Sequence, residues 1–159
     1  QGEPSFEHTE AEALPVLDID GVRGRVVAGS AYGKRSPVTI SSDLFYVDAR
    51  VTQGQLLRVP DAYAQRAAYV VEGALHVGDV SLRAGELVSF KASAQVDLVA
   101  DRHTHVVLLG GAPLDAPRYL WWNYVASSEA ILENARRDWR EKRFPMVEGD
   151  SEFIPLPTR

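Results

Sequence analysis

Residues 74–82 read ALHVGDVSL, two short runs of mainly apolar residues on either side of Gly78 and Asp79. A glycine-aspartate pair at this place is typical of the two-residue turn that joins antiparallel strands. Turn-forming pairs also flank the stretch, Glu72-Gly73 before it and Ala84-Gly85 after it. The stretch therefore predicts a tight β-hairpin with one short strand on each side of its turn.

Similar short runs, rich in valine, leucine, tyrosine and phenylalanine, recur on both sides of this hairpin and are separated by turn residues. They lie at 22–28, 44–49, 55–59, 67–72, 86–90, 96–100 and 105–109. Runs of this length and spacing are typical of antiparallel strands that close into a jelly roll or a sandwich. We therefore predict an all-β fold.

A helical pattern follows the strands. Ser127 and Ser128 are suited to cap a helix, apolar residues then recur at steps of four, and Pro145 stops the pattern. The apolar stripe comprises Ile131, Ala135 and Trp139. The sequence therefore predicts a single C-terminal α-helix at about 128–142, whose basic last turns we interpret as a solvated helix end.

The two ends of the chain differ in character. Residues 1–20 are acidic and contain prolines, so we expect an extended connector that becomes ordered only near Leu17 and Ile19. The tail at 149–157 is apolar, and we expect it to dock against the barrel. The predicted organisation is a connector at 1–20 followed by one barrel domain at 21–157, which includes the helix and the tail.

The composition excludes several functions. The 159 residues contain no cysteine, which rules out disulfides, thiolate metal sites and a cysteine nucleophile. A net charge of -5 provides no broad basic surface, so a direct nucleic-acid partner is disfavoured. No stretch approaches the roughly 20 apolar residues of a membrane span. We expect a soluble, cytoplasmic protein without a membrane partner.

Histidines offer the main candidates for a metal site. His103 and His105 stand two residues apart at the start of a strand, where alternate side chains share a face. A mononuclear site normally needs three or four converging ligands, so we interpret the pair as two histidines at a loop exit and keep it only as a weak candidate. No serine stands in a nucleophile elbow, and we assign no catalytic residue.

Several blocks together resemble the C-terminal domain of the pirin family. They are RAAYVVEG at 66–73, LLGGAPL at 108–114, WWNYVASS at 121–128 and FIPLP at 153–157. The resemblance covers nearly all of the chain from Pro4 to Pro157. It implies a cupin-type, RmlC-like jelly-roll β-barrel with one C-terminal α-helix, corresponding to the second barrel of a two-barrel protein, or bicupin, whose N-terminal half is absent here.

The resemblance also implies where the family's chemistry lies. Pirin-like proteins hold iron or another divalent metal in the N-terminal barrel through three histidines and a glutamate. They are described as quercetin 2,3-dioxygenases or, in eukaryotes, as nuclear transcription cofactors, which would add a nuclear location. In this barrel the matching ligand positions fall on Val59, Asp61, Gln65 and the segment 86–91, without a histidine. We therefore expect a metal-free barrel without a cofactor, whose dioxygenase activity would need the N-terminal half.

Adjacent tryptophans in the WWNYVASS block raise the question of a partner surface. If the segment is extended, Trp121 and Trp122 point to opposite sides, so one can face its own barrel and the other a second domain. We expect this face to pack against the N-terminal cupin domain of the same parent protein. The residues assigned to it are Trp121, Trp122, Tyr124 and Phe153.

Two alternatives remain open. The chain could be an interaction module that binds a protein partner or forms a homodimer, with a dependence on Arg136 or Arg140. It could also be a small-molecule-binding cupin with a rebuilt site, since barrels of this size can enclose one ligand. The candidate cavity-lining residues are Tyr46, Arg66, Tyr69 and His76.

Overall fold

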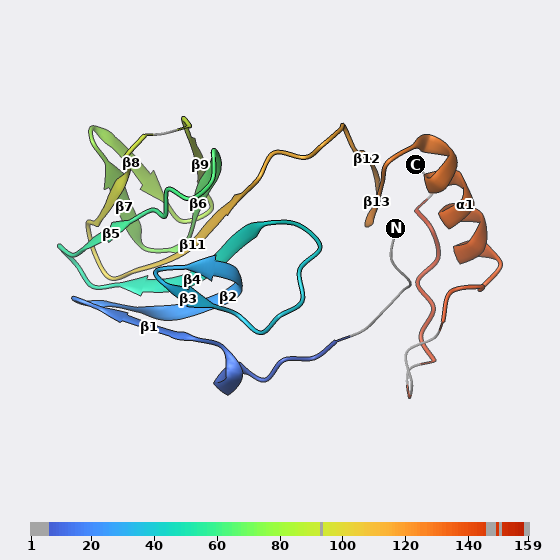
Figure 1. Cartoon of the computed structure of the whole chain (residues 1–159), viewed down its shortest axis with the longest axis horizontal. Coiled ribbons are helices and arrows are strands. Elements are labelled where there is room, and N and C mark those ends of the chain that lie inside the picture. The colour runs from blue at the N-terminus through green and yellow to red at the C-terminus, as the bar shows by residue number, and fades with distance from the viewer. Residues whose placement is uncertain (1–6, 93, 146–148, 150, 158–159) are drawn as a thin grey trace. The chain divides into compact units, whose positions relative to one another are not determined.

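The computed structural model describes residues 7–92, 94–145, 149 and 151–157. The chain forms two compact units, residues 1–113 and residues 114–159 (Figure 1). All strands of the barrel belong to the first unit, whereas a short hairpin and the only helix with more than one turn among the described residues belong to the second. Each unit is described by itself below.

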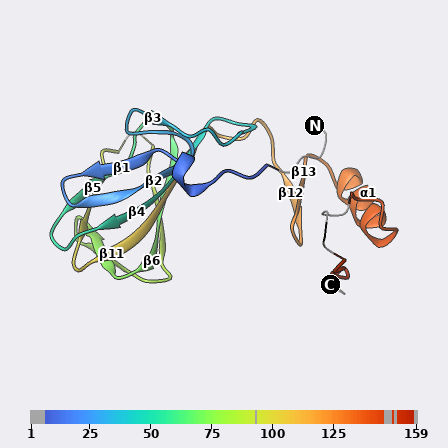
Figure 2. The same cartoon turned by 90° about the horizontal axis from the view of Figure 1, so that it is seen from below.

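The larger sheet of the first unit has seven strands in the order β1-β2-β4-β11-β6-β9, with β3 paired to β2. The central strands lie side by side in Figure 2. The strands span Val16–Ile19 (β1), Val22–Ala31 (β2), Lys34–Arg35 (β3), Leu44–Val51 (β4), Gln65–Glu72 (β6), Leu87–Phe90 (β9) and Thr104–Gly111 (β11). All of these pairs are antiparallel, which places one face of each strand inward and the other outward.

The smaller sheet has four strands in the order β5-β10-β7-β8. They span Leu56–Arg58 (β5), Ala74–Val77 (β7), Val80–Arg83 (β8) and Asp97–Ala100 (β10). The predicted hairpin is confirmed, because β7 pairs with β8 across a turn in which Gly78 has a φ of 55°. A positive φ strains most residues but not glycine, so the local turn chemistry sets this register.

The core of the first unit lies between the two sheets. Phe45, Val47 and Leu108 contribute from the larger sheet, and Leu75 and Leu98 from the smaller one, all at most 1% exposed. Alternation along antiparallel strands brings these side chains to one side, where their burial stabilises the two-sheet barrel. The predicted all-β fold with one C-terminal helix is confirmed, and each of the predicted strands is present within a few residues.

The lead-in segment contributes a strand to the barrel near Leu17 and Ile19. A 3-10 turn at Ala11–Ala13 precedes β1, and β1 pairs with β2 from Val16 to Ile19. Leu17 is fully buried in the core. The predicted boundary at residue 20 falls after β1 and so separates this edge strand from the sheet to which it belongs. Leu17 is the one buried residue of β1 and is flanked by exposed residues, so the strand has little buried sequence pattern to mark it.

The second unit contains β12 (Tyr119–Trp121), β13 (Tyr124–Ala126) and α1 (Glu129–Arg140). Strands β12 and β13 pair as a hairpin, and Trp122 lies in its turn with a φ of 53°. The expectation of one extended segment at this point is therefore wrong, because the chain reverses between Trp121 and Tyr124.

Among the described residues, α1 and the short 3-10 turn are the helices, and neither has the length and hydrophobicity of a membrane span.

The predicted helix is confirmed, two residues shorter at its C-terminal end. Ser128 is its N-cap, and the Ser128 hydroxyl accepts a hydrogen bond from the Ile131 amide at 3.4 Å. Leu132 is the most buried side chain of α1, whereas Ile131 and Trp139 are half-buried. A helix of this length is marginal by itself in water, so its stability depends on the contacts of its apolar face.

Candidate functional site

The positions that the resemblance assigns to metal ligands do not fit a metal ion. Val59 is 1% exposed and packs in the hydrophobic core, where it offers no donor atom. Asp61 lies in an exposed loop and Gln65 at the exposed start of β6. A buried aliphatic group, one amide and one carboxylate lack the imidazole nitrogens that a histidine-rich iron site requires.

Asp61, the carboxylate among Val59, Asp61 and Gln65, lies near a cation. The Arg58 guanidinium hydrogen bonds both carboxylate oxygens of Asp97, at 2.8 and 3.1 Å. This bidentate pair raises the pKa of Arg58, with a further contribution from the charge of Asp61, and it lowers the pKa of the Asp97 carboxyl. The carboxylate that pairs with Arg58 is therefore Asp97 and not Asp61.

The two histidines of the candidate pair, His103 and His105, have different surroundings. The His105 Nε2 atom lies 2.6 Å from a carboxylate oxygen of Asp48 on the neighbouring strand β4, and His103 precedes β11 in an exposed turn. In the smaller sheet, His76 Nδ1 lies 2.6 Å from Asp101. Within residues 7–92, 94–145, 149 and 151–157, no cluster of three or more histidine and acidic side chains is suited to hold a metal ion.

A cavity of about 580 Å³ lies at one end of the larger sheet. Its walls come from the start of β4, the start of β6, the end of β9 and the end of β11. Tyr46 and Arg66 are among the residues that line it. Tyr69 lies outside it on the outer face of β6 and is 37% exposed, and His76 lies in the other sheet. Of the four candidate residues, His76 thus lies in the smaller sheet and the other three in the larger one, where Arg66 and Tyr69 are on opposite faces of β6.

Gly110 and Gly111, from the block LLGGAPL at 108–114, also line this cavity. They are the last two residues of β11 and pair with both β4 and β6. A Cβ atom built on Gly110 would lie 2.3 Å from the Phe45 ring. The glycine therefore permits the close approach of Phe45, which the sequence signalled only by the unusual pair of glycines at the end of an apolar run.

The WWNYVASS block forms an aromatic cluster within the second unit. The Trp139 ring of α1 is the centre of this cluster, with ring centroids 5.5–6.5 Å from its four neighbours. The neighbours are Trp122, Tyr124, Phe144 and Phe153. Trp121 stacks on Tyr124, and the Arg136 guanidinium lies 4.2 Å from the centroid of a Trp121 ring. The tryptophans thus have partners inside their own unit.

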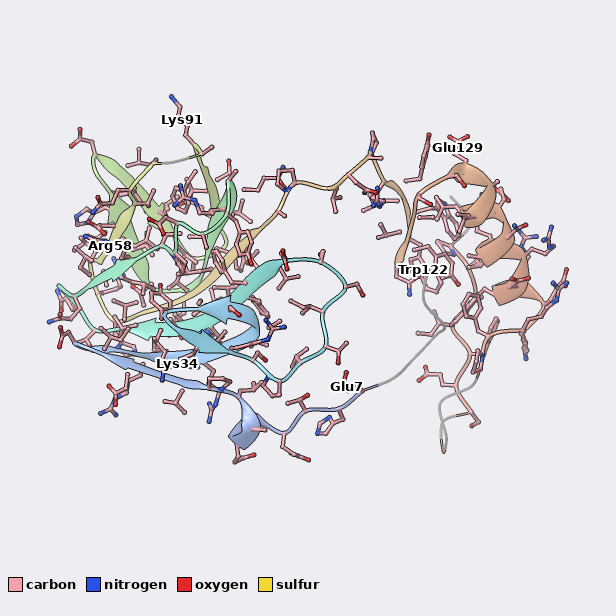
Figure 3. All side chains as sticks on the ribbon, in the orientation of Figure 1. Glu7, Lys34, Arg58, Lys91, Trp122 and Glu129 are labelled. Atoms are coloured by element: carbon pink, nitrogen blue, oxygen red, sulfur yellow. The ribbon has the colours of Figure 1, made fainter. Side chains whose placement is uncertain are left out.

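The described part of the tail packs on the helix. Phe153 stacks on Trp139, and the Trp139 indole N–H donates a 2.8 Å hydrogen bond to the Ile154 carbonyl. The described residues of the tail therefore contact α1, and docking of the tail against the barrel stays a prediction. Trp122 remains 40% exposed, and Figure 3 shows it at the hairpin. The predicted packing against a second domain stays a prediction for all four residues assigned to it, Trp121, Trp122, Tyr124 and Phe153.

Comparison with known proteins agrees with this architecture. The family model of the pirin C-terminal cupin domain matches residues 46–145. A pirin-like protein of Caulobacter vibrioides is 38% identical over 157 residues, which are 98% of this chain and 54% of that protein. Human pirin is 23% identical over 148 residues, which are 89% of this chain and 51% of that protein.

A solved structure of quercetin 2,3-dioxygenase from Acinetobacter baumannii superposes with a TM-score of 0.79 at 28% identity. The match covers 92% of this chain and 50% of that one. The chain thus spans about half the length of the curated relatives quoted above. The cupin-type jelly roll is confirmed, and the chain belongs to the pirin family, in which it corresponds to the C-terminal cupin domain.

Proposed function

We propose that this chain is the metal-free, structural half of a two-barrel pirin-like protein. In this proposal an N-terminal cupin domain is its partner and carries the metal and the quercetin 2,3-dioxygenase-type activity. The observation that carries the proposal is the chemistry of the ligand positions, where Val59 is buried in the core and Asp61 and Gln65 are exposed, with no imidazole among the three. These residues offer no set of donors for iron.

Metal content and turnover of this chain test the first part of the proposal. After incubation with ferrous iron and dialysis, we expect less than about a tenth of an equivalent of iron by plasma mass spectrometry, because the ligand positions lack imidazoles. Quercetin added to the same sample in air should not be consumed. The quercetin 2,3-dioxygenase of Acinetobacter baumannii is the positive control for both measurements.

A variant of this chain with His103→Ala and His105→Ala distinguishes a rebuilt site from adventitious iron. Retention of about one equivalent of iron by the unmodified chain, and its loss in the double variant, would contradict a metal-free barrel. Iron retained equally by both would also contradict it and would direct the search to other ligands. Consumption of quercetin by this chain alone would overturn the division of labour between the halves.

The outer face of the larger sheet supports the partner part of the proposal. Tyr69 and Val71 on β6 and Leu87 on β9 are 37%, 41% and 58% exposed, and register places Tyr69 opposite Leu87. We call these three residues the outer apolar face. Neighbouring exposed apolar side chains are typical of surfaces that another domain covers. Since the chain spans half the length of its relatives, the other half is the occupant to which we assign this face.

A fusion in which this chain replaces the matched half of the Caulobacter vibrioides relative tests this assignment. We expect hydroxyl-radical oxidation of Tyr69 and Leu87 to fall several-fold in the fusion relative to the isolated chain, because the partner barrel would exclude water from them. Leu56 and Val80, which are 47% and 58% exposed on the smaller sheet, are the internal controls and should change little. Equal oxidation of Tyr69 and Leu87 in both proteins would refute the assignment.

A further inference from the structure

Three arginines lie together on the outer face of the larger sheet. Arg23 and Arg25 on β2 and Arg50 on β4 are exposed. Val22 and Val51, each next to one of them, are buried in the core. Strands β1, β2 and β4 lie side by side at this edge of the sheet (Figure 2). Alternation along the strands therefore directs the three guanidinium groups away from the core, and we call them the outer arginine cluster.

The register of β2 and β4 places two of these charges next to each other. Arg23 lies directly opposite Arg50, and Arg25 lies directly opposite Asp48. Like charges at directly opposite positions of an antiparallel pair destabilise it. The cluster therefore contains an unfavourable electrostatic interaction that an anion from outside the chain would relieve.

Carboxylates on the same face neutralise only part of this charge. Asp18 lies 4.0 Å from Arg23, and both side chains are largely exposed, so the pair contributes little. In the part of the chain that the structure describes, no carboxylate lies within 4.0 Å of the Arg25 guanidinium. Donors of Arg25 therefore remain available to an acidic group.

Asp48 is shared between two partners. One of its oxygens lies 3.7 Å from Arg50, and the other lies 2.6 Å from the His105 ring. The nearest carboxylate to the middle of the cluster is thus already in contact with an imidazole. The cluster keeps a positive charge, which favours an anionic partner.

A hollow of about 430 Å³ opens beside the cluster. It lies within β1, β2 and β4, and its lining includes Val16, Arg23, Arg25, Tyr46, Asp48 and Arg50. Tyr46 also lines the cavity of about 580 Å³ at the end of the larger sheet. The two hollows therefore adjoin at this tyrosine.

The outward-facing wall of the larger cavity is apolar. Ala67, Leu109 and Tyr46 form one row across β6, β11 and β4. This row shares the outer face with Tyr69, because Ala67 and Tyr69 are two residues apart on β6. The outer face of the larger sheet thus has an apolar half and a cationic half, which meet at Tyr46.

A second cross-strand row joins the outer apolar face to the outer arginine cluster. It runs from Leu87 through Tyr69, Val107 and Asp48 to Arg25. Neighbouring strands lie about 4.8 Å apart, so the ends of the row are about 19 Å apart along the sheet. An interface of standard size, about 800 Å² on each partner, extends over such a distance. A domain that covers Leu87 and Tyr69 would therefore also reach the cluster.

We propose that the outer face binds an extended acidic segment of the N-terminal half, with carboxylates on the outer arginine cluster and one apolar side chain at Ala67 and Leu109. Guanidinium groups form strong charge-assisted hydrogen bonds with carboxylates, and such pairs fix the register of an interface. Charge complementarity and continuity with the outer apolar face identify this occupant. The inference rests on the proposed function for its partner and adds the chemistry by which that partner is recognised.

The first test measures recognition by the unmodified chain. The probe is the peptide acetyl-Trp-Gly-Ser-Gly-Glu-Glu-Glu-amide, in which the indole and the first carboxylate are about 14 Å apart when the peptide is extended. This is the distance of three strand separations, from Ala67 to Arg25. The control peptide has glutamine in place of each glutamate. We expect a Kd below about 1 mM for the acidic peptide at low salt and binding at least about tenfold weaker for the control.

A double variant tests the role of the cluster. Arg23→Gln with Arg25→Gln should weaken the acidic peptide by about tenfold or more, because it removes two of the three guanidinium groups. Its thermal midpoint should not fall, since the substitution also removes the repulsion between Arg23 and Arg50. A purely structural role of the arginines would lower the midpoint instead. The matched control, Arg83→Gln with Arg102→Gln, changes the net charge equally at exposed positions away from this face and should bind the peptide nearly as the unmodified chain does.

The second test uses the fusion with the matched half of the Caulobacter vibrioides relative. Hydroxyl-radical oxidation of Tyr46 should fall several-fold in the fusion, because the acidic segment would cover it. Oxidation should rise again in the fusion that carries Arg23→Gln and Arg25→Gln. The fusion with Arg83→Gln and Arg102→Gln should stay protected.

Equal affinity of the unmodified chain for the two peptides would overturn the inference, and so would unchanged affinity in the double variant. Tighter binding of oligothymidylate than of the acidic peptide would assign the cluster to a nucleic acid instead. Protection of Tyr69 and Leu87 in the fusion, without any effect of the double variant on Tyr46, would refute the acidic segment and leave the proposed partner in place. Equal oxidation of all three residues in the fusion and in the isolated chain would refute both.

Discussion

The Gly29→Ala variant is expected to lose more than about 4 kcal/mol of unfolding free energy, enough to leave a marginally stable domain largely unfolded. Gly29 lies in β2 opposite Phe45, with a φ of 70°. A Cβ atom at Gly29 would lie 1.8 Å from the backbone oxygen of Leu44. A backbone atom inside the sheet cannot move aside alone, so strand β4 would have to separate from β2 or shift along it.

The matched control is Gly33→Ala. Gly33 has the same φ of 70°, but no other atom lies within 4 Å of the Cβ position. It should therefore cost only the conformational strain of an L-residue in the left-handed region, about 1–2 kcal/mol. Urea unfolding followed by circular dichroism measures both variants. Equal losses in the two variants would mean that the strand contact at Gly29 adds nothing to the strain of its φ angle.

The Gly29 result bears on the candidate site as well as on the fold. Leu44, Phe45 and Tyr46, at the start of β4, line the cavity that contains Arg66. A displacement of β4 would therefore also change the shape of this cavity.

The Trp139→Ala variant is expected to destabilise the second unit by about 3 kcal/mol or more, the usual range for loss of a large packed aromatic ring. Its ring contacts four other aromatic side chains, and these contacts connect α1 to the hairpin and to the tail. A helix of 12 residues has little stability of its own. Hydrogen exchange of the α1 amides and the near-ultraviolet circular dichroism of the tryptophans measure the loss.

The control for this variant is Trp139→Phe. Phenylalanine keeps an aromatic ring among the same neighbours but removes the indole N–H that donates to the Ile154 carbonyl. The expected cost is about 1 kcal/mol, typical of one hydrogen bond. If Trp139→Phe were as destabilising as Trp139→Ala, the hydrogen bond to the tail would be the main interaction, and the aromatic cluster would contribute little to the stability of α1.

Local chemistry is the reason that much of the fold was predictable. The hairpin at 74–82 depends on a glycine with positive φ and on neighbours a few residues apart, and β7 and β8 form where the sequence indicates them. The helix α1 depends on a serine cap and on spacing along one segment, and its predicted start is one residue from the observed one. In each case the interactions that decide the structure lie within a few residues of one another.

Other features depend on residues that are distant in sequence. The assignment of β1 to the barrel follows from the burial of Leu17 by other strands, and the contacts of Trp122 follow from a chain reversal that brings it to Trp139. Neither contact has a periodic signal, because each involves a single side chain and a partner from another element. The sequence pattern therefore predicts a connector at 1–20 and an extended segment at the tryptophan pair.

The sequence by itself determined the strand pattern, the helix, the family resemblance and the lack of histidines at the expected ligand positions, because all of these are properties of residue type and local spacing. Only the tertiary structure decided that Arg66 is buried without an acidic partner among the described residues, in the cross-strand row that contains Gly110 and Phe45. The physical reason is that burial and charge pairing are set by strand register across the sheet, which brings together residues that lie 21 and 44 positions from Arg66 along the chain.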